Sequence, residues 1–264
     1  MDYPSFLYKY RNWENDYNKI ELLDSELYFT SALNFNDPFE CKIPLNYEDE
    51  SEEYIRKSIA YHIKERDKNI SDADLHKEVD YWYNKKNWSN PDNIELMLAK
   101  LNSIGLYSLS STYDNILMWS HYANSHRGFC ISYDIKKLRQ FFETEYFDNY
   151  NNLVNLVEVK YYEEFPNFLP SDLNSQQYYE LPISSKAIDW EYEGEYRFYI
   201  MDHVNIKVKV PLNVIDSIYL GCQMPLEIKS KIKKYLLTRE YKVKLFQSNR
   251  NKDAFKLNFK EIQY

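Results

Sequence analysis

Glycine is scarce in this sequence of 264 residues. The four glycines, Gly105, Gly128, Gly194 and Gly221, lie far apart, whereas the phosphate-binding loops of P-loop and Rossmann folds need several glycines within one turn. The HExxH, GxSxG and acidic calcium-loop patterns are also missing. A Rossmann or P-loop enzyme is therefore excluded, and the commonest metal and serine-hydrolase chemistries lack their signatures.

Cysteine and long apolar runs are scarce as well. The three cysteines, Cys41, Cys130 and Cys222, form no CxxC pair, which favours reduced thiols in a cytoplasm over a disulfide framework or a zinc site. No run of 18 apolar residues occurs, and the N-terminal sequence has no basic region followed by an apolar stretch. We therefore expect a cytoplasmic protein with no metal and no membrane partner.

Tyrosine and segregated charge are what the sequence has in excess. The 27 tyrosines offer flat faces with a polar tip, which suit stacking on a base or ring and equally suit ordinary half-buried packing. The net charge is −8, yet residues 227–260 carry 11 Lys and Arg against 3 Asp and Glu. Such a basic segment can meet nucleic acid or an acidic partner, although a solvated helix face is the commoner outcome.

Periodicity predicts a mixture of strands and helices. Alternating segments predict strands, and they are residues 6–11, 26–31, 106–111, 128–133, 156–161, 194–200, 204–210, 214–220, 242–247 and 254–259. The strands between 194 and 220 resemble a meander. Residues 51–104 are acidic, lysine-rich and helically periodic, with a capping pattern at residues 71–74 and a helix start at Pro91, which predicts a helical insertion or lid. With no repeat or low-complexity linker, the chain is expected to form one α+β domain over residues 1–264 with a mostly antiparallel sheet.

Residues 34–40, Asn-Phe-Asn-Asp-Pro-Phe-Glu, predict a turn. Asn and Asp side chains bond their own backbone, and Pro38 pushes Asp37 out of the helical region. Turns of this kind often position ligand contacts. Asn36 and Asp37 are therefore candidate binding residues.

Residues 188–200, IDWEYEGEYRFYI, hold the densest group of charges. Alternation predicts that Glu193, Glu195, Arg197 and Tyr199 share one face of a strand. Two carboxylates placed in this way repel each other and raise at least one pKa unless a cation or a ligand hydroxyl lies between them. Arg197 is the candidate cation, and the alternative is a solvated Glu/Arg ladder on an edge strand.

Residues 119–128 form a second cluster of chemically capable side chains. His121 and His126 are five residues apart, so they do not share a helix face, and no third ligand accompanies them, which argues against a metal. Trp119 and Tyr122 do share a face; they could stack on a flat ring, but the same spacing is typical of a core-facing stripe. We expect core packing for this aromatic pair and a role in the site for His121.

Five blocks of sequence together resemble an uncharacterised bacterial domain-of-unknown-function family. They lie between residues 6 and 222 and read LYKYR, LYFTSALNFNDPFE, SLSSTYDNILMWSHYANSHRGFCISYD, KAIDWEYEGEYRFYI and IYLGC. The marks of the family are the NDPFE turn, the MWxHYAxxHxG segment and the WxYExEYR strand. The family name carries no function.

The order of three strand motifs is also similar to that of ADP-ribosyltransferases of the arginine/serine/glutamate type. In that superfamily the first strand holds NAD, the second shapes the pocket and the last glutamate does the chemistry, on a split, mostly antiparallel sheet. The positions that match are Tyr8 or Arg11 for the first motif, Thr30 and Ser31 for the second, and Glu193 and Glu195 for the third. Residues 108–112, SLSST, compete for the second motif, and the interval from 31 to 193 is long.

The resemblance implies NAD as co-substrate. Cleavage of the nicotinamide–ribose bond develops positive charge on the ribose, of the kind that glycosidases stabilise with carboxylates. Glu195 would stabilise that charge, and Glu193 would orient or deprotonate the nucleophile. Arg197 would hold Glu195 ionised or contact a phosphate. Aromatic residues would sandwich nicotinamide or adenine, and the candidates are Tyr8, Tyr10, Trp119 and Tyr122.

The resemblance therefore implies an NAD-dependent mono-ADP-ribosyltransferase, as a toxin or phage-defence effector. Its acceptor would be RNA, DNA or protein, with nucleic acid favoured by the basic residues 227–260. A toxin implies a neutralising antitoxin protein, for which the acidic residues 48–80 are a candidate surface. Two alternatives stay open. One is a non-catalytic nucleotide or nucleic-acid binding module, and the other is a metal-independent nuclease or hydrolase that uses His121 with Glu195.

Overall fold

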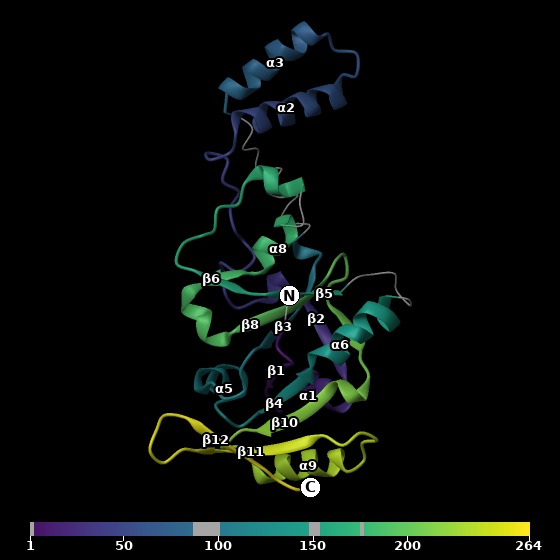
Figure 1. The fold of residues 1–264 in the computed structure, drawn as a ribbon, viewed down its shortest axis with the longest axis vertical. Coiled ribbons are helices and arrows are strands. Elements are labelled where there is room, and N and C mark those ends of the chain that lie inside the picture. The colour runs from purple at the N-terminus through teal and green to yellow at the C-terminus, as the bar shows by residue number, and fades with distance from the viewer. Residues whose placement is uncertain (1–2, 87–100, 148–153, 175–176) are drawn as a thin grey trace.

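The computed structural model describes residues 3–86, 101–147, 154–174 and 177–264 (Figure 1). The elements, with η for short 3₁₀ or π turns, are β1 (Phe6–Arg11), α1 (Asp16–Leu23), β2 (Glu26–Ser31), η1 (Ala32–Asn34), α2 (Glu52–Arg66), α3 (Asp72–Asn84), β3 (Gly105–Ser110), α5 (Ile116–Tyr122), β4 (Phe129–Asp134), α6 (Ile135–Phe141), η2 (Phe142–Tyr146), β5 (Val154–Glu158), β6 (Lys160–Tyr162), η3 (Pro170–Asn174), α8 (Gln177–Ile183), β7 (Ser185–Ala187), η4 (Ile188–Glu193), β8 (Glu195–Ile200), β9 (Ile206–Lys209), η5 (Leu212–Val214), β10 (Ile215–Leu220), α9 (Leu226–Leu236), β11 (Lys244–Arg250) and β12 (Leu257–Glu261).

One large open sheet organises the molecule, in the order β12-β11-β10-β4-β1-β3-β2-β9, with β8 paired to β3 and β5 paired to β8. Its pairs are antiparallel except for β10 with β11. Strands β6 and β7 form a separate parallel pair. The predicted α+β domain with a mostly antiparallel sheet is confirmed.

The sheet is split along one edge of β3. Strand β1 pairs with β3 through Tyr8 and Ser110, and β2 pairs with it at Leu106 and Gly105, so the middle of this edge has no strand partner among the residues that the structure describes. Lys9 fills the gap: its ammonium donates to the Ser108 carbonyl and lies 4.8 Å from the centre of the Tyr107 ring. A lysine thus satisfies a carbonyl that a continuous sheet would have satisfied.

The predicted meander over residues 194–220 is wrong. Strand β8 pairs with β3 and β5, β9 with β2, and β10 with β4 and β11. The connections at 201–205 and 210–214 carry the chain across the sheet instead of closing hairpins. Strand β8 is buried on both faces, which is typical of an interior strand.

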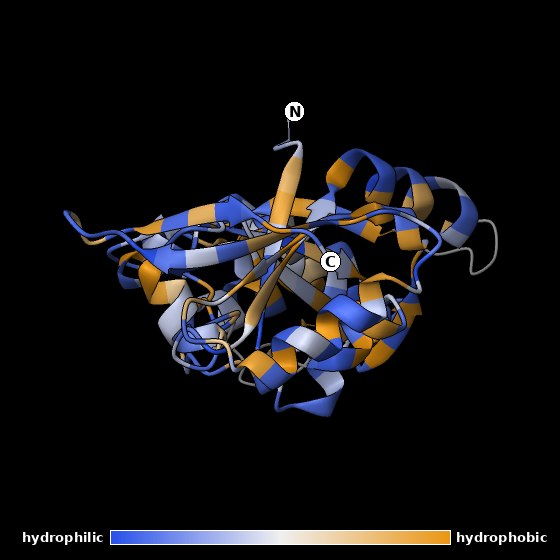
Figure 2. Ribbon diagram, turned by 90° about the horizontal axis from the view of Figure 1, so that it is seen from below, coloured by the Kyte–Doolittle hydropathy of each residue, from blue (hydrophilic) through white to orange (hydrophobic). Residues whose placement is uncertain are grey.

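The two faces of the sheet carry different interiors. Helices α1, α6 and α9 cover one face, where Leu22, Leu138 and Ile232 join the largest apolar cluster. The other face carries two smaller clusters, one that includes Tyr199 and one that includes Trp119. Colouring by hydropathy shows helices striped orange and blue, as expected for helices with one buried side (Figure 2).

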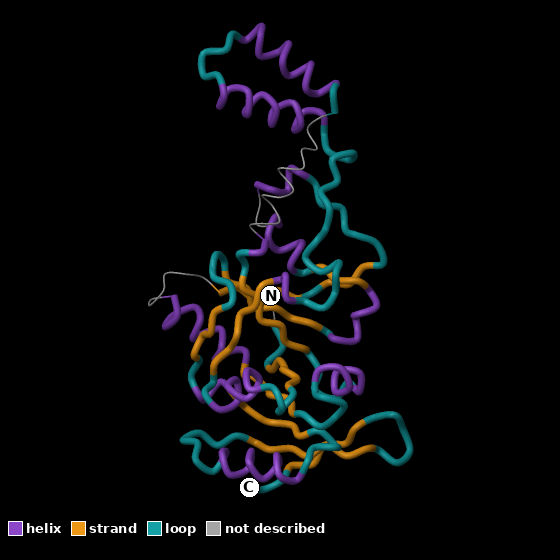
Figure 3. Tube along the Cα trace, turned by 180° about the vertical axis from the view of Figure 1, so that it is seen from behind, coloured by secondary structure: helices purple, strands orange, loops and turns teal. Residues whose placement is uncertain are grey.

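Helices α2 and α3 form a hairpin that projects from the body of the protein, at the top of Figure 1 and of Figure 3. The hairpin has its own small core of Ile63, Leu75 and Val79, and Ser71 caps α3 as predicted, by accepting from the Asp74 N–H at 3.2 Å. The predicted helix start at Pro91 lies outside the described residues. Among the residues described, no helix is both long and apolar enough to cross a membrane.

Candidate functional site

Gly194 determines how the acidic stretch enters the sheet. Its φ of +50° ends η4 in the left-handed conformation, and a Cβ there would lie 2.3 Å from the Ser111 Oγ. The prediction that Glu193 shares a strand face with Glu195 is therefore wrong, because Glu193 is the last residue of η4 and β8 begins at Glu195. The Glu193 side chain nevertheless reaches the same place as Glu195 through Lys186.

Arg197 holds Glu195 with two parallel hydrogen bonds. Its Nε lies 2.8 Å from Oε1 and its Nη2 lies 2.7 Å from Oε2. The same Nη2 donates to Glu40 Oε1, and Nη1 donates to the Ile183 carbonyl at 2.7 Å. Arg197 is fully buried (0% exposed), so these acceptors replace all of its hydration.

Lys186 is the second cation of the site. Its Nζ lies 2.5 Å from Glu193 Oε2, 3.0 Å from Glu195 Oε2 and 3.4 Å from Glu40 Oε1. Three buried carboxylates thus surround two buried cations. We call Glu40, Lys186, Glu193, Glu195 and Arg197 the charge cluster.

Hydroxyl groups of neighbouring elements complete the charge cluster. Tyr122, from α5, donates to Glu193 Oε1 at 2.5 Å. The Tyr161 hydroxyl, from β6, accepts from the Glu195 N–H at 2.8 Å. Ser110, from β3, donates to the Glu193 carbonyl at 2.6 Å. Tyr122 therefore orients the Glu193 carboxylate, while Tyr161 and Ser110 hold the backbone at Glu195 and Glu193.

The charge cluster separates the pKa values of two of its carboxyl groups. Burial raises the pKa of Glu40, and the charge of Glu195 adds to this rise against the opposing effect of Arg197 and Lys186. Burial also acts to raise the pKa of Glu195, but Arg197, Lys186 and a hydrogen bond with Ser108 outweigh it and hold that pKa well below its ordinary value. Of these two, Glu195 is thus the fixed anion, and Glu40 is the carboxyl group that takes a proton more readily.

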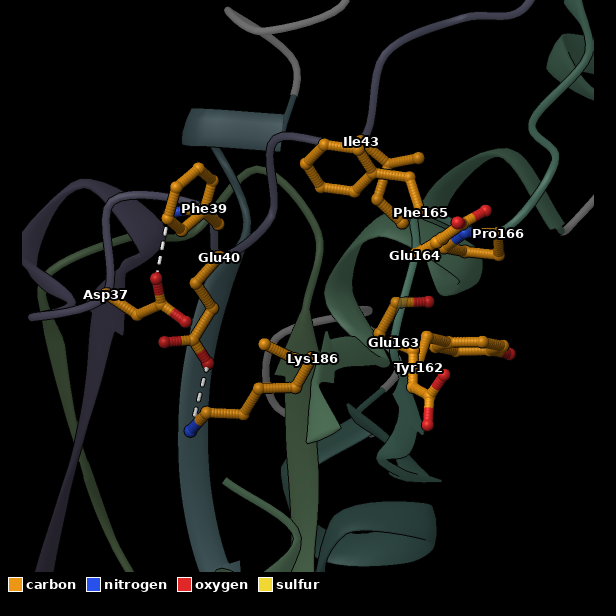
Figure 4. Close-up of a pocket in the computed structure, with 12 residues that line it drawn as sticks. Asp37, Phe39, Glu40, Ile43, Tyr162, Glu163, Glu164, Phe165, Pro166 and Lys186 are labelled. Carbon is orange, nitrogen blue, oxygen red and sulfur yellow. Dashed lines mark hydrogen bonds and ion pairs between the residues drawn. The ribbon is translucent and has the colours of Figure 1, made fainter. Parts of the chain in front are cut away.

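A cavity of about 400 Å³ adjoins the charge cluster (Figure 4). Glu40 and Lys186 belong to both, and Figure 4 shows the Lys186 side chain extending to the Glu40 carboxylate. Its mouth carries two exposed aromatic rings, Phe39 and Phe165, whose centroids are 6.5 Å apart. The lining residues are Asp37, Phe39, Glu40, Ile43, Tyr162, Glu163, Glu164, Phe165, Pro166, Ser185, Lys186 and Ala187. This volume lies in the range of ordinary small-molecule sites.

The NDPFE turn contributes to the cavity. The Asp37 carboxylate accepts from the Phe39 N–H at 2.9 Å, and this contact shapes the turn that presents Phe39 and Glu40. Asn36 is exposed and is not among the lining residues. Of the two residues predicted from this turn, Asp37 is therefore the one that lies at the site.

The structure brings together four of the predicted site residues at the charge cluster, namely Tyr122, Glu193, Glu195 and Arg197, and a fifth, Asp37, lines the adjoining cavity. Trp119 instead belongs to the core: it is fully buried and its Nε1 donates to the Tyr113 carbonyl at 2.8 Å.

His121 is exposed, with its ring 6.2 Å from Tyr192 and 6.4 Å from Tyr122. Its ring contacts are thus with tyrosines at the edge of the charge cluster.

The contacts described for the residues predicted from the first two strands are with residues outside the charge cluster. Arg11 pairs with Glu21, which also accepts from Tyr133 at 2.9 Å. Tyr8 packs against Tyr113, with ring centroids 5.2 Å apart. In β2, Thr30 accepts from Asn34 at 3.0 Å and Ser31 caps η1. The competing SLSST segment lies closer, because Ser108 and Ser110 pair with Arg197 and Glu195 in the sheet.

Sequence reasoning missed Glu40 and Lys186. Glu40 is the last residue of the predicted turn, and Lys186 lies outside every predicted strand; nothing local pairs either residue with Arg197 or Glu195. One signal was available, because both residues lie within the blocks that resemble a known family. Burial of an unpaired charge is costly, so a charge placed inside such blocks indicates a partner elsewhere in the chain.

The described residues contain no group of three or more His, Cys, Asp or Glu that could hold a metal ion. No curated protein and no solved structure matches the chain. Residues 118–198, which include Tyr122, Lys186, Glu193, Glu195 and Arg197, match the model of a family described as a protein of unknown function (DUF2971), and this match confirms the predicted resemblance to an uncharacterised domain-of-unknown-function family.

Proposed function

We propose that this protein is an NAD-dependent mono-ADP-ribosyltransferase in which Glu195 stabilises the charged ribose. The observation that carries the proposal is a glutamate held ionised on a rigid strand by Arg197 and Lys186, next to a cavity of ligand size. An anion that is already oriented stabilises a developing positive charge without reorganising in the transition state.

The proposed reaction assigns different tasks to Glu193 and Glu195. The bond between nicotinamide and ribose C1′ breaks, nicotinamide leaves with the electron pair, and the acceptor forms a new bond to C1′. Glu195 lies against the charged ribose, and Glu193, which Tyr122 orients at 2.5 Å, takes the proton of the acceptor. Arg197 keeps Glu195 ionised throughout.

The cavity supports the binding of a flat cationic ring. Phe39 and Phe165 offer two aromatic faces at its mouth, and the carboxyl groups of Asp37, Glu163 and Glu164 surround it. The nicotinamide ring of NAD is flat and positively charged, so aromatic faces and carboxylates both favour it.

Lys186 lies between the cavity and the two glutamates, because it lines the cavity and binds Glu193 and Glu195. In the proposal, the ribose hydroxyls of bound NAD replace the Lys186 ammonium at Glu195.

The acceptor in this proposal is nucleic acid, with RNA favoured, and the biological role is that of a toxin or defence effector with a neutralising protein partner. The test is transfer of label from isotopically labelled NAD to RNA, DNA or protein in a cell extract. We expect transfer by the wild type and by Glu53→Gln, an exposed control on α2, and none by Glu195→Gln. Circular dichroism at the assay temperature establishes that the Glu195→Gln protein is folded.

A second variant keeps the test decisive if Glu195→Gln unfolds. In Glu193→Gln, transfer to the acceptor should fall more than nicotinamide release, because Glu193 acts on the acceptor and Glu195 acts on the ribose. Equal transfer by the wild type and a folded Glu195→Gln protein would refute the proposal, and so would the absence of both transfer and nicotinamide release.

One observation favours a second candidate, a non-catalytic nucleotide-binding module. Glu195 is only 5% exposed, and cations occupy both of its oxygens. In such a module the charge cluster would only support the cavity, and a folded Glu195→Gln protein would bind nucleotide as the wild type does. Nucleotide affinity measured beside nicotinamide release separates the two candidates.

A further inference from the structure

The turn between β11 and β12 presents a phenylalanine to solvent. Phe255 is 100% exposed. The turn is ordered: the Asn251 N–H donates to the Lys256 carbonyl at 3.0 Å, and the Asn251 side chain accepts from the N–H groups of Asp253 and Ala254 at 2.8 and 2.9 Å. The backbone therefore holds Phe255 outward, although burial of a side chain of this size would stabilise the fold.

Four basic residues lie on the same hairpin as this phenylalanine, namely Arg250, Lys252, Lys256 and Lys260. All are exposed, and none forms an ion pair with any residue that the structure describes. We call Phe255 and these four residues the hairpin tip. Asp253 is the single acidic residue between positions 250 and 260.

Three basic residues of helix α2 provide a contrast. Arg56 pairs with Glu52 and Asp80, Arg66 pairs with Glu78, and Lys57 pairs with Glu53. These positive charges have intramolecular partners. The charges of the hairpin tip remain available to an external anion.

The hairpin tip lies in the most basic part of the molecule. Helix α9, which adds the exposed Lys234 and further basic residues, lies beside β11 and β12 at the end opposite to the α2–α3 hairpin (Figures 1 and 3). This end is positive although the whole chain carries a net charge of −8. Local charge of this kind attracts a polyanion to one end of the protein.

We infer that the hairpin tip binds single-stranded nucleic acid, with its basic side chains on the phosphates and Phe255 stacked on an unpaired nucleobase. Single-strand binding requires two parts, positively charged side chains that contact the backbone and an exposed aromatic ring that stacks on a nucleobase, and this hairpin carries both. The nucleobases of a duplex are already stacked on each other, so they leave no internal face for Phe255. The combination therefore selects single strands.

Binding of the strand does not require NAD. The inference extends the proposed function by making the bound strand the acceptor, and in that respect it rests on the proposed function. A binding assay without NAD separates the failure of one from the failure of the other.

The test is fluorescence anisotropy of a labelled 12-nucleotide single-stranded RNA, and of a duplex of the same sequence, titrated with the full-length protein at 50–200 mM NaCl. If the four basic side chains each neutralise one phosphate, the logarithm of affinity should fall against the logarithm of salt concentration with a slope of about −3, at ~0.7 per phosphate. Phe255→Ala should weaken single-strand binding about tenfold, which is within the loss expected for one base stack. The double variant Lys252→Ala/Lys256→Ala should reduce the slope by about 1.4.

Two matched controls come from the α2–α3 hairpin. Tyr61→Ala removes an aromatic side chain that is 63% exposed, and Lys64→Ala/Lys68→Ala removes two exposed charges; both should bind RNA as the wild type does. Equal losses of RNA affinity in the control variants and in the hairpin-tip variants would overturn the inference, as would no binding of RNA at 50 mM NaCl. It would also be overturned by duplex preference with no effect of Phe255→Ala, or by Phe255-dependent binding to phosphatidylserine vesicles without binding to RNA.

Discussion

Replacement of Glu195 and of Glu40 by glutamine should have very different effects on stability, although both residues are buried carboxyl groups in contact with Arg197. Both oxygens of Glu195 accept from cations: Oε1 from Arg197, and Oε2 from Arg197 and Lys186. A glutamine at this position must therefore place an NH₂ group against a cation. In Glu40, both cation contacts go to Oε1, so glutamine can keep its carbonyl oxygen there and turn its NH₂ group to the side of Oε2.

The protonation states reinforce this difference. Glu195 is the carboxylate whose pKa lies well below the ordinary value, whereas the pKa of Glu40 is raised. Glutamine resembles a protonated glutamate. At position 195 it therefore removes a negative charge that stabilises the folded protein strongly, and at position 40 it removes one that stabilises it less. Removing one partner of a buried ion pair costs about 3–5 kcal/mol. Loss of a single neutral hydrogen bond costs ~1 kcal/mol.

For Glu195→Gln we therefore expect a fall in melting temperature of roughly 6–20 °C, at about 2–4 °C per kcal/mol for a chain of this size. Glu40→Gln should lower the melting temperature by less than about 4 °C. The measurement is thermal and urea unfolding at pH 7 followed by circular dichroism, with the exposed variant Glu53→Gln as control. Equal destabilisation by Glu40→Gln and Glu195→Gln would refute the reasoning, because both residues would then be equally committed anions.

Three further predictions follow from other features. Because the pKa of Glu40 is raised above 4.5 in the folded protein, its contribution to stability is present below pH 4.5 and is lost as pH rises through the folded pKa. In urea unfolding, the free energy of unfolding of Glu40→Gln should therefore rise relative to that of the wild type between pH 4.5 and 8. Burial lowers the pKa of Lys9 to about 7 from 10.5, so the unfolding free energy of the wild type should rise relative to Lys9→Met between pH 7 and 10, and an unchanged difference would contradict this. Gly194→Ala should lower the melting temperature, and Ser111→Ala added to it should restore only part of the loss, because the second change relieves the Cβ contact and leaves the φ of +50°.

Local patterns gave most of the elements, because alternation and capping depend on neighbouring residues. Strands β1 and β2 match the predicted ranges 6–11 and 26–31, and Ser71 caps α3 through its own first turn. The pairing of strands was less accessible. Residues 206–209 form a strand as predicted, but their partner is β2, almost 180 residues earlier in the chain, and alternation contains no information on the partner.

The charge cluster shows the same limit. The sequence identified Glu193, Glu195 and Arg197 because they lie within five residues of each other, and the pairing of Arg197 with Glu195 follows from their common strand face. The positive φ of Gly194, which turns Glu193 out of the strand, has a visible cause in the glycine but was not foreseen. Glu40 joins Arg197 across 157 positions, and only the folded chain reveals that contact. The hairpin tip is intermediate: the charge of residues 227–260 was visible, and the exposure of Phe255 was not.

The most direct test of the central claim is nicotinamide release from NAD, followed by chromatography with purified wild type, Glu195→Gln and Glu53→Gln. If Glu195 stabilises the charged ribose, the wild type and Glu53→Gln should release nicotinamide at the same rate, and a folded Glu195→Gln protein should release it about 10²–10³-fold more slowly. Equal release by all three proteins, or no release by the folded wild type in the presence of an RNA acceptor, would contradict a catalytic role for the charge cluster.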